Sequence, residues 1–428
     1  MYRSLVELLI EIGENFVDLL NREAQRDLGL GVLGVGLVLL SYGLIWGSVD
    51  GFVEALDHDD RLFSDFRRFY YPMGEVLFSE QWPVAGYYYT SFFALGLSVV
   101  ALLPSSPAVY VWGALQLVWV VSLFCVAGRW LLGLTGRGLV IFSLVITTSL
   151  PLLHNFKWGQ VSVLMTLGIL SAFALHRQGR SEYGGVVLAL ATCIKYYPGV
   201  FVVYFLIRRD WRLVFAFGLG SLAFYCFLPM IFMGPSGWWY FEWGAIQSLP
   251  ASALLLNDFN TQYFPHVINR LGFPLGYRLS AVTVDLLRWL GLLVFIINSI
   301  LIWWIQQRDL AYKTALSAAA LLLSLPFIVQ TSWPHYFVYL PFCQSALWLA
   351  LAAAKIRIWV RRLLYAPIVF SALLSSAYFF ALLPNWRLYN GMGLLWLSDL
   401  ALLGSWFGLC ALGRKSDSSE HTLYIDGR

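Results

Sequence analysis

The chain has 428 residues, of which 59% are hydrophobic and 12% are charged. Soluble domains average roughly 45–50% apolar and about 25% charged residues, so this composition excludes an ordinary soluble protein. The formal net charge of +4 is small for a membrane protein with basic inner loops, and it gives no indication of nucleic-acid binding.

The N-terminal segment, residues 1–28, is amphipathic and carries Glu7, Glu11, Glu14 and Arg22. Because a cleavable signal peptide would need an apolar stretch here, we expect this segment to lie on the cytoplasmic membrane surface. At the other end of the chain, the polar residues 413–428 are expected to form a cytoplasmic tail.

Between these ends, residues 29–412 are dominated by long apolar runs. Runs that approach or reach the roughly 20 residues needed to cross a bilayer lie near 30–47, 107–127, 138–153, 159–175, 183–207, 212–232, 282–305, 313–330, 336–354, 363–383 and 390–412. Their length and uniform hydrophobicity indicate helices rather than the alternating strands of a barrel. We therefore predict an all-α polytopic membrane protein, a multi-pass protein of the plasma membrane with about ten to twelve membrane helices.

Short loops rich in Lys and Arg usually remain in the cytoplasm, and this rule orients the helices. With the basic clusters around Arg129, Arg177 and Arg208 inside, residues 48–106 form a large first outer loop. Within that loop, residues 88–104 are expected to be a re-entrant or surface-lying helix, because a full crossing would place Arg129 on the wrong side.

The run 183–207 has basic residues at both ends, so it is expected to enter the membrane and return to the same side. Pro198 and Gly199 favour a break in its middle, which would leave Lys195 at the tip of a helical hairpin. The alternative is a single kinked span from which the Lys195 ammonium reaches water along its flexible stem.

The first outer loop is acidic, and one of its carboxylates stands apart. Asp57, His58, Asp59 and Asp60 could ligate a divalent metal, although a solvated acidic loop is the commoner explanation, and we predict no metal site. Asp65 lies where the hydrophilic stretch meets an aromatic helix. A carboxylate at that junction can meet a lipid head group and a hydrophilic acceptor together.

Two shorter outer segments carry further polar side chains. Residues 154–160 bring His154, Lys157 and Gln160 to the start of a span, and His335 stands where another span re-enters the membrane. For either histidine, a hydrogen-bonded side chain at the membrane interface is the simpler interpretation.

The second large outer loop, residues 233–280, mixes aromatic and amide side chains. This mixture suits a surface that holds sugar rings, although a packed lid would have a similar composition. The candidate acceptor-binding residues are Trp243, Asn257, Asp258, Asn260, Gln262 and His266.

Several motifs together resemble glycosyltransferase family 87, whose members use polyprenyl-phosphate sugars and have the GT-C fold. The resemblance covers roughly residues 60–345. The motifs are Asp65-Phe66-x-x-Phe69-Tyr70-x-Pro-x-Gly, Tyr87-Tyr88-Tyr89-x-Ser91, Trp158-Gly159-Gln160-Val161-Ser162, Gly184-Gly185 followed by Ile194-Lys195-x-x-Pro198, Arg208-Arg209-x-Trp211-Arg212 and Ser332-Trp333-Pro334-His335-Tyr336. The resemblance implies a GT-C helical bundle with its catalytic domain in residues 29–412 and its active site on the extracytoplasmic side.

The resemblance also implies that Asp65 is the catalytic carboxylate of an inverting sugar transfer, with mannose the commonest donor sugar. A positioned carboxylate can take the proton of an attacking hydroxyl, and fixed cations can stabilise a leaving lipid phosphate. Lys195 is the preferred phosphate ligand and His335 the preferred partner of Asp65; no cofactor is expected. The other candidate ligands of the donor are Arg67, Arg68, His154, Lys157 and Gln160.

A polytopic transporter or lipid flippase is the main alternative, since carriers also combine many spans with broken helices. Carriers tend to contain internal repeats, and the Gly-Gln and Ile-Lys-x-x-Pro motifs have no convincing second copy. The long acidic loop also favours an enzyme that acts at the membrane surface on a glycolipid or glycan acceptor.

Overall fold

The structure is a computed structural model that describes residues 22–56, 62–79, 84–248, 255–256, 258–273, 276–308 and 310–412. Within these residues the chain is helical, with an isolated bridge that pairs Ser149 and Ser376. The prediction of an all-α fold is therefore confirmed.

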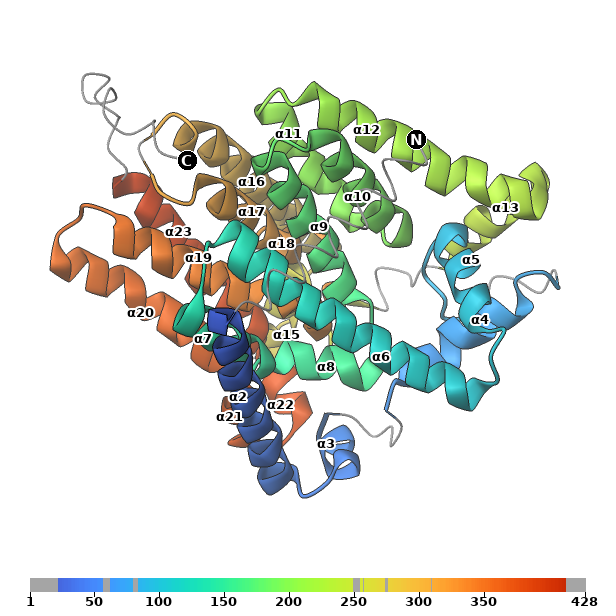
Figure 1. Ribbon diagram of the computed structural model, residues 1–428, viewed down its shortest axis with the longest axis horizontal. Helices are drawn as coiled ribbons and strands as arrows, with labels where there is room; N and C mark the ends of the chain where they lie inside the picture. The colour runs from blue at the N-terminus through green and yellow to red at the C-terminus, as the bar shows by residue number, and fades with distance from the viewer. Residues whose placement is uncertain are drawn as a thin grey trace.

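Figure 1 shows how the helices are arranged. In the first half they are α2 (Arg22–Trp46), α3 (Val49–Leu56), η1 (Phe66–Tyr70), α4 (Tyr71–Val76), α5 (Ser91–Val100), α6 (Ser105–Leu123), η2 (Phe124–Leu131), α7 (Gly136–Thr147), α8 (Leu150–Trp158), α9 (Ser162–Arg177), α10 (Ser181–Ile194), η3 (Tyr197–Phe201) and α11 (Val202–Ile207). In the second half they are α12 (Trp211–Ser221), η4 (Leu222–Phe227), α13 (Leu228–Ser248), α15 (Phe264–Gly272), α16 (Ala281–Ile305), α17 (Lys313–Leu322), α18 (Leu325–Ile328), η6 (Pro334–Tyr339), α19 (Leu340–Ala353), α20 (Ile358–Leu374), α21 (Ala377–Ala381), α22 (Trp386–Gly391) and α23 (Leu394–Leu412).

Five apolar helical stretches in the described residues are long enough to cross a membrane, and a sixth is a pair bent by 71° between Val32–Trp46 and Val49–Leu56. The five are Ser105–Leu131, Trp211–Gln247, Ala281–Ile305, Pro334–Ala353 and Leu394–Leu412. The chain is therefore a polytopic membrane protein. Fewer uninterrupted spans are found than the ten to twelve expected, because breaks divide several apolar runs into helices of 10–17 residues.

Burial separates the central helices from the peripheral ones. In the most apolar part of Pro334–Ala353 and of Leu394–Leu412, 72% and 61% of the residues are buried. The corresponding fractions are 11% in Trp211–Gln247 and 17% in Ala281–Ile305. Apolar side chains on the peripheral helices can remain exposed because lipid is itself apolar. Figure 1 shows α4, α5 and α13 gathered at one end of the molecule, and α19, α20 and α23 at the other.

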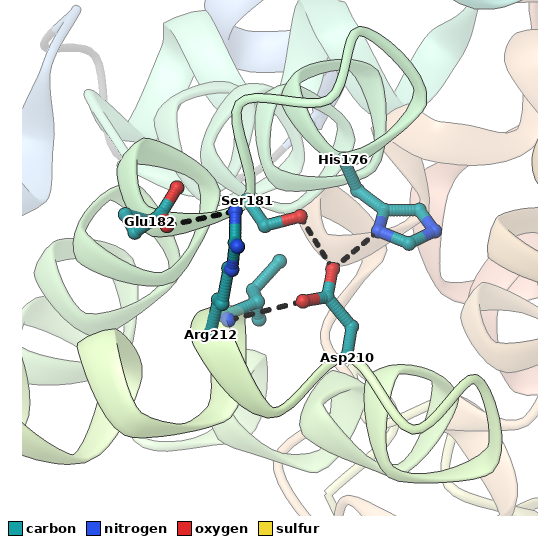
Figure 2. A network of polar contacts seen from close by, with 6 residues as sticks. His176, Ser181, Glu182, Asp210 and Arg212 are labelled. Carbon is teal, nitrogen blue, oxygen red and sulfur yellow. Dashed lines mark hydrogen bonds and ion pairs between the residues drawn. The ribbon is translucent and has the colours of Figure 1, made fainter.

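The run that was expected to form a hairpin is indeed broken at Lys195. Helix α10 ends at Ile194, Lys195 is extended with φ −145° and ψ 129°, and the chain continues as the short helices η3 and α11. After α11, Asp210 accepts hydrogen bonds from Ser181 Oγ at 2.5 Å and from the His176 ring at 2.6 Å (Figure 2). Because Ser181 begins α10, the chain has returned to the level at which the hairpin started.

Lys195 therefore lies at the tip of the hairpin, far from the end at which Ser181 and Asp210 meet. Helix α10 has 14 residues, which correspond to about 21 Å at 1.5 Å per residue. At the base, Asp210 also caps α12 through a 3.2 Å hydrogen bond from the Leu213 N–H, and Arg212 lies 3.8 Å from Glu182 (Figure 2). The base is thus held by polar contacts, and the tip carries a single ammonium.

The segment expected to be re-entrant in the first loop is also short. Helix α5 has 10 residues, about 15 Å, so it is too short to cross a bilayer alone. It is capped by Thr90, whose hydroxyl accepts from the Phe93 N–H at 3.3 Å, and it ends before the turn that leads into α6.

Candidate active site

Asp65 is fixed in place by the aromatic helix that follows it. It immediately precedes η1, and the fully buried Phe66 stacks on Trp112 with ring centroids 4.7 Å apart and planes 17° apart. This stacking anchors the start of η1 against α6. The carboxylate of the half-buried Asp65 is thereby directed at the loop that joins α8 to α9.

Gln160 in that loop is the hydrogen-bond partner of Asp65. Its amide Nε2 donates to Asp65 Oδ2, and its Oε1 accepts from the Tyr70 hydroxyl at 2.9 Å and from the Tyr89 hydroxyl at 2.8 Å. Because both ends of the amide are engaged, Gln160 holds the carboxylate in one orientation. Among the described contacts, Gln160 occupies the partner position that was expected for His335.

The α8–α9 loop is itself held by a second set of hydrogen bonds. Trp112 Nε1 donates to the Gly159 carbonyl at 2.9 Å, and Gln116 Nε2 donates to the Gln160 carbonyl at 2.7 Å. Gly159 has φ +68°, and a Cβ here would lie 3.1 Å from Cβ of Phe63 and 3.2 Å from Cβ of Phe66. Glycine is therefore required both by the left-handed backbone and by the close approach of η1.

The environment shifts the acidity of the candidate base. Burial raises the pKa of Asp65 to about 6, although the Gln160 hydrogen bond and the nearby charges of Lys157, Lys195 and Arg68 act in the opposite direction. A carboxyl group with such a pKa is ionised at neutral pH and remains a better proton acceptor than an ordinary aspartate.

Lys195 reaches the same cluster from the tip of the hairpin. Its ammonium lies 3.3 Å from the Tyr89 hydroxyl, 4.9 Å from the centre of the Tyr89 ring and 4.2 Å from that of Tyr336. Among the described residues, no carboxylate forms an ion pair with it. Aromatic faces hold the ammonium in position by cation–π attraction and leave its charge available to an anion.

Lys157 and His154 approach from helix α8. The Lys157 side chain is fully buried, and its ammonium lies 3.5 Å above the Trp158 ring. Trp158 Nε1 donates to His154 Nε2 at 2.8 Å, and burial, followed by the charge of Lys157, holds the pKa of His154 well below its usual range. His154 is therefore neutral, with its ring proton on Nδ1.

His335 lies at the end of a row of stacked rings. His335 stacks on His154 at 5.5 Å, His154 on Trp386 at 4.9 Å, and Trp386 on Tyr389 at 5.9 Å. His335 is 3% exposed, and neither of its ring nitrogens has a hydrogen-bond partner among the described residues. Since buried polar atoms are almost always paired, these nitrogens mark a place where a ligand can supply the partner.

The structure thus brings together most of the residues predicted for the donor side. The positive charges of Lys157, Lys195 and Arg68 each lie close enough to the Asp65 carboxylate to lower its pKa. Arg67 is exposed, and its Nε donates to the Leu62 carbonyl at 3.0 Å, so it braces its own loop.

The residues predicted for the acceptor side have different surroundings. Asn260 Oδ1 accepts from Trp386 Nε1 at 2.9 Å and from Asn390 Nδ2 at 3.0 Å, and Gln262 Nε2 donates to the Asn390 carbonyl at 3.2 Å. Because these amides bond to α22, they support the ring row behind His335. In the same region His266 is paired with Thr261 at 2.9 Å.

The remaining acceptor candidates lie apart from this network, or outside the residues that the structure describes. The Asp258 carboxylate accepts from the Asn260 N–H at 2.8 Å and so shapes its own turn. Trp243 on α13 is 51% exposed and stacks on Trp239 at 6.2 Å. Asn257 and the acidic run from Asp57 to Asp60 lie outside the described residues.

Several neighbours of the site were not singled out from the sequence. Tyr70, Tyr89 and Tyr336 supply hydroxyls and ring faces, and Trp386 supports His154. Aromatic residues at span ends are usually interface anchors, so their type gave no signal of a role in the site. All three tyrosines nevertheless belong to the motifs that carried the family resemblance.

Comparison with known proteins identifies the family of the chain. The model of glycosyltransferase family 87 matches residues 87–329, which are more than half of the chain. A polyprenol-phosphate-mannose-dependent alpha-(1-2)-phosphatidylinositol mannoside mannosyltransferase of Mycobacterium tuberculosis is 26% identical over 191 residues. The match spans 44% of this chain and 42% of that relative, so the chain aligns with less than half of the relative's length. No solved structure matches. Because the family model matches more than half of this helical membrane protein, the chain belongs to glycosyltransferase family 87.

Proposed function

We propose that this membrane glycosyltransferase transfers a sugar, mannose in the first instance, from a polyprenyl-phosphate donor to a glycolipid or glycan acceptor on the extracytoplasmic side, with inversion at the anomeric carbon. The observation that carries the proposal is the hydrogen bond from Gln160 to Asp65, within a cluster that also contains the Lys195 ammonium. A fixed base beside fixed cations suits the displacement of a lipid phosphate by a hydroxyl.

In the proposed reaction, Asp65 acts as the general base. A hydroxyl oxygen of the acceptor attacks the anomeric carbon of the donor sugar, and its proton passes to the Asp65 carboxylate. The bond between that carbon and the phosphate oxygen breaks, and polyprenyl phosphate leaves with the electron pair. Gln160 donates to one carboxylate oxygen, Oδ2, so the other oxygen is the one that we assign to the incoming hydroxyl.

The phosphate of the donor is assigned to the cationic side of the cluster. Lys195 is held between the rings of Tyr89 and Tyr336, and Lys157 is buried nearby on α8. Two fixed ammonium groups would bind the phosphate of the substrate and stabilise the additional charge that it gains as the bond breaks. This arrangement supplies the positive charge without a metal ion.

His335 and His154 are assigned to hydrogen bonding with the donor. Both ring nitrogens of His335 and Nδ1 of His154 are buried without a partner among the described residues. A phosphate or sugar hydroxyl placed against these nitrogens would satisfy them. The ring row that ends at Tyr389 would keep both imidazoles in position while the substrate enters.

Substitution of Asp65 tests this proposal. We expect Asp65→Asn to reduce sugar transfer at least about 10³-fold, because an amide cannot accept the proton, while the protein still inserts and folds. The measurement is the transfer of radiolabelled mannose from polyprenyl-phosphate mannose to membrane lipids and glycans.

The exposed Asp50 of the same loop provides the matched control, since Asp50→Asn removes an equal charge at a position outside the cluster. The control should transfer mannose at the wild-type rate. Transfer by Asp65→Asn at a rate close to that of Asp50→Asn would refute the assignment of the base. Offering labelled arabinofuranose, or a hexose other than mannose, on the same lipid phosphate shows which sugar the enzyme transfers.

A further inference from the structure

A buried carboxylate outside the proposed site joins several parts of the fold. Glu242 on α13 is 3% exposed. It accepts hydrogen bonds from Ser91 N–H at 2.9 Å, Ser91 Oγ at 2.6 Å, the Tyr225 hydroxyl at 3.0 Å and the Tyr196 hydroxyl at 3.3 Å. A carboxylate costs several kcal/mol to bury unless its hydrogen bonds are satisfied, so this concentration of donors is a specific arrangement.

Two of the donor residues are close in sequence to the residues that hold the candidate phosphate ligand. Tyr196 directly follows Lys195, and Ser91 lies two positions after Tyr89, whose hydroxyl contacts the Lys195 ammonium at 3.3 Å. Between them, the Thr90 hydroxyl donates to the carbonyl of Cys193 on the hairpin. Glu242 therefore tethers both partners of the Lys195–Tyr89 contact to one helix.

The tip of the hairpin needs such a tether because it has left the helical hydrogen-bond pattern. Lys195 is extended, and η3 begins only at Tyr197. The Tyr196 side chain is 45% exposed, so packing alone restrains it weakly, whereas a hydrogen bond to a charged acceptor is about twice as strong as a neutral one.

We propose that Glu242 is a positioning residue that fixes the hairpin tip through Tyr196, so that the Lys195 ammonium stays between Tyr89 and Tyr336 and faces the donor phosphate. This inference rests on the proposed function for its kinetic consequence. It adds a role for α13, a peripheral helix on which the buried Phe241 also packs against Tyr87, with ring centroids 6.1 Å apart. No described contact joins Glu242 to Asp65, Gln160 or Lys195, so it acts through Tyr196 on the hairpin and through Ser91 beside Tyr89.

The tether makes a specific kinetic prediction for Glu242→Gln, which keeps the shape and removes the charge. Because Lys195 would bind the phosphate both in the ground state and in the transition state, its displacement should raise KM for polyprenyl-phosphate mannose. We expect an increase of about tenfold in KM and a smaller fall in kcat, since Lys195 would also stabilise the charge that the phosphate gains as the bond breaks. The KM for the acceptor should not change.

Variants that each lack one hydroxyl group distinguish a tether at the hairpin tip from a general structural role of Glu242 in holding α13. Tyr196→Phe removes the hydroxyl that joins the hairpin tip to Glu242 and should raise the donor KM in the same direction. Tyr225→Phe removes a bond from η4 to the same carboxylate and should raise the donor KM less, because Tyr225 reaches the tip only through its packing against Tyr196. Glu182→Gln is the matched charge control, because Glu182 lies in an exposed ion pair at the base of the same hairpin.

A donor KM that stays at the wild-type value in folded Glu242→Gln, or a fall in kcat without a change in KM, would overturn the inference. Equal effects of Tyr196→Phe and Tyr225→Phe would do so too, since they would indicate a merely structural role.

Hydrogen exchange tests the tether independently of catalysis. In Glu242→Gln, amides in residues 193–199 should exchange faster than in wild type, whereas those of α9 should not. If the wild type transfers no sugar from polyprenyl phosphates, the proposed function fails while this measurement still decides the tether. Unchanged exchange at 193–199 would then overturn the tether alone.

Discussion

At the scale of single residues, the candidate site depends on how a few side chains are satisfied. Gln160 uses its amide nitrogen on Asp65 and its oxygen on Tyr70 and Tyr89, so the carboxylate cannot rotate freely. Lys195 is held by ring faces instead of a carboxylate. The Asp65 carboxylate thus remains available to a proton and the Lys195 ammonium to a phosphate, whereas a direct ion pair between them would neutralise both.

The raised pKa of Asp65 leads to a prediction on pH. Burial is the largest influence and raises the pKa of Asp65 to about 6, and only the ionised form can accept the proton of the acceptor. Lowering the pH through 6 should therefore reduce transfer about tenfold per pH unit, with full activity above pH 7. The measurement is the pH profile of kcat/KM for mannose transfer in proteoliposomes.

As a control, the thermal unfolding midpoint is measured at each pH to show that the protein stays folded. A profile that stays flat between pH 7 and 5, with the protein folded throughout, would exclude Asp65 as the titrating base.

At the scale of elements, breaks in the helices create the site. The α8–α9 turn at Gly159 presents Gln160 to η1, and the interruption after Ile194 brings Lys195 to the tip of the hairpin. A continuous helix through either point would keep these backbone segments in regular hydrogen bonds and would direct the side chains into the bundle. The polar bonds of Asp210 close the hairpin at its other end (Figure 2).

Gly159→Ala tests the α8–α9 turn. In a backbone with φ +68°, its Cβ would lie 3.1 Å from Cβ of Phe63 and 3.2 Å from Cβ of Phe66, the first residue of η1, so this segment must move by a few tenths of an ångström. We expect sugar transfer to fall at least about tenfold, because displacement of a positioned base is costly even when it is small. Transfer and the thermal unfolding midpoint are measured on the same preparation.

Gly133→Ala is the matched control, since Gly133 has φ +67° and no atom within 4 Å of a new Cβ. Both variants carry about the same backbone strain, on the order of 1 kcal/mol. If the two variants lost activity equally, strain and not the contact with η1 would explain the result.

At the scale of the whole molecule, the polar cluster and the basic hairpin base lie at opposite ends of α10. Asp210, Arg212 and Glu182 meet at the base, and Lys195 stands about 21 Å away, at 1.5 Å for each of the 14 residues. A basic end in the cytoplasm would place the cluster toward the other membrane surface. This orientation agrees with a lipid-phosphate donor that is used outside the cytoplasm.

Labelling of single cysteines tests this orientation. Ser79 lies in the first loop after α4, and Gln178 lies in the turn between α9 and α10; both are exposed. We expect a membrane-impermeant maleimide to label Ser79→Cys on intact cells and Gln178→Cys only after permeabilisation. The parent protein, with its five native cysteines, sets the background.

The reverse labelling pattern would place the cluster in the cytoplasm and would contradict an extracytoplasmic transfer. Labelling of both positions on intact cells would instead show that the reagent had crossed the membrane, which a cytoplasmic marker protein in the same cells detects.

The sequence by itself determined the membrane class, the break at Lys195 and the family, since hydrophobic runs, Pro198 and Gly199, and the Trp-Gly-Gln motif act locally along the chain. It also identified Asp65, Lys157 and Lys195 as members of one cluster, whose catalytic roles stay predictions. Only the tertiary structure decided that Gln160 orients Asp65, that Asn260 and Gln262 bond to α22, and that Glu242 holds Tyr196. These partners are separated by 95, 126, 128 and 46 positions, so their pairing depends on how the helices pack, and no local pattern encodes it.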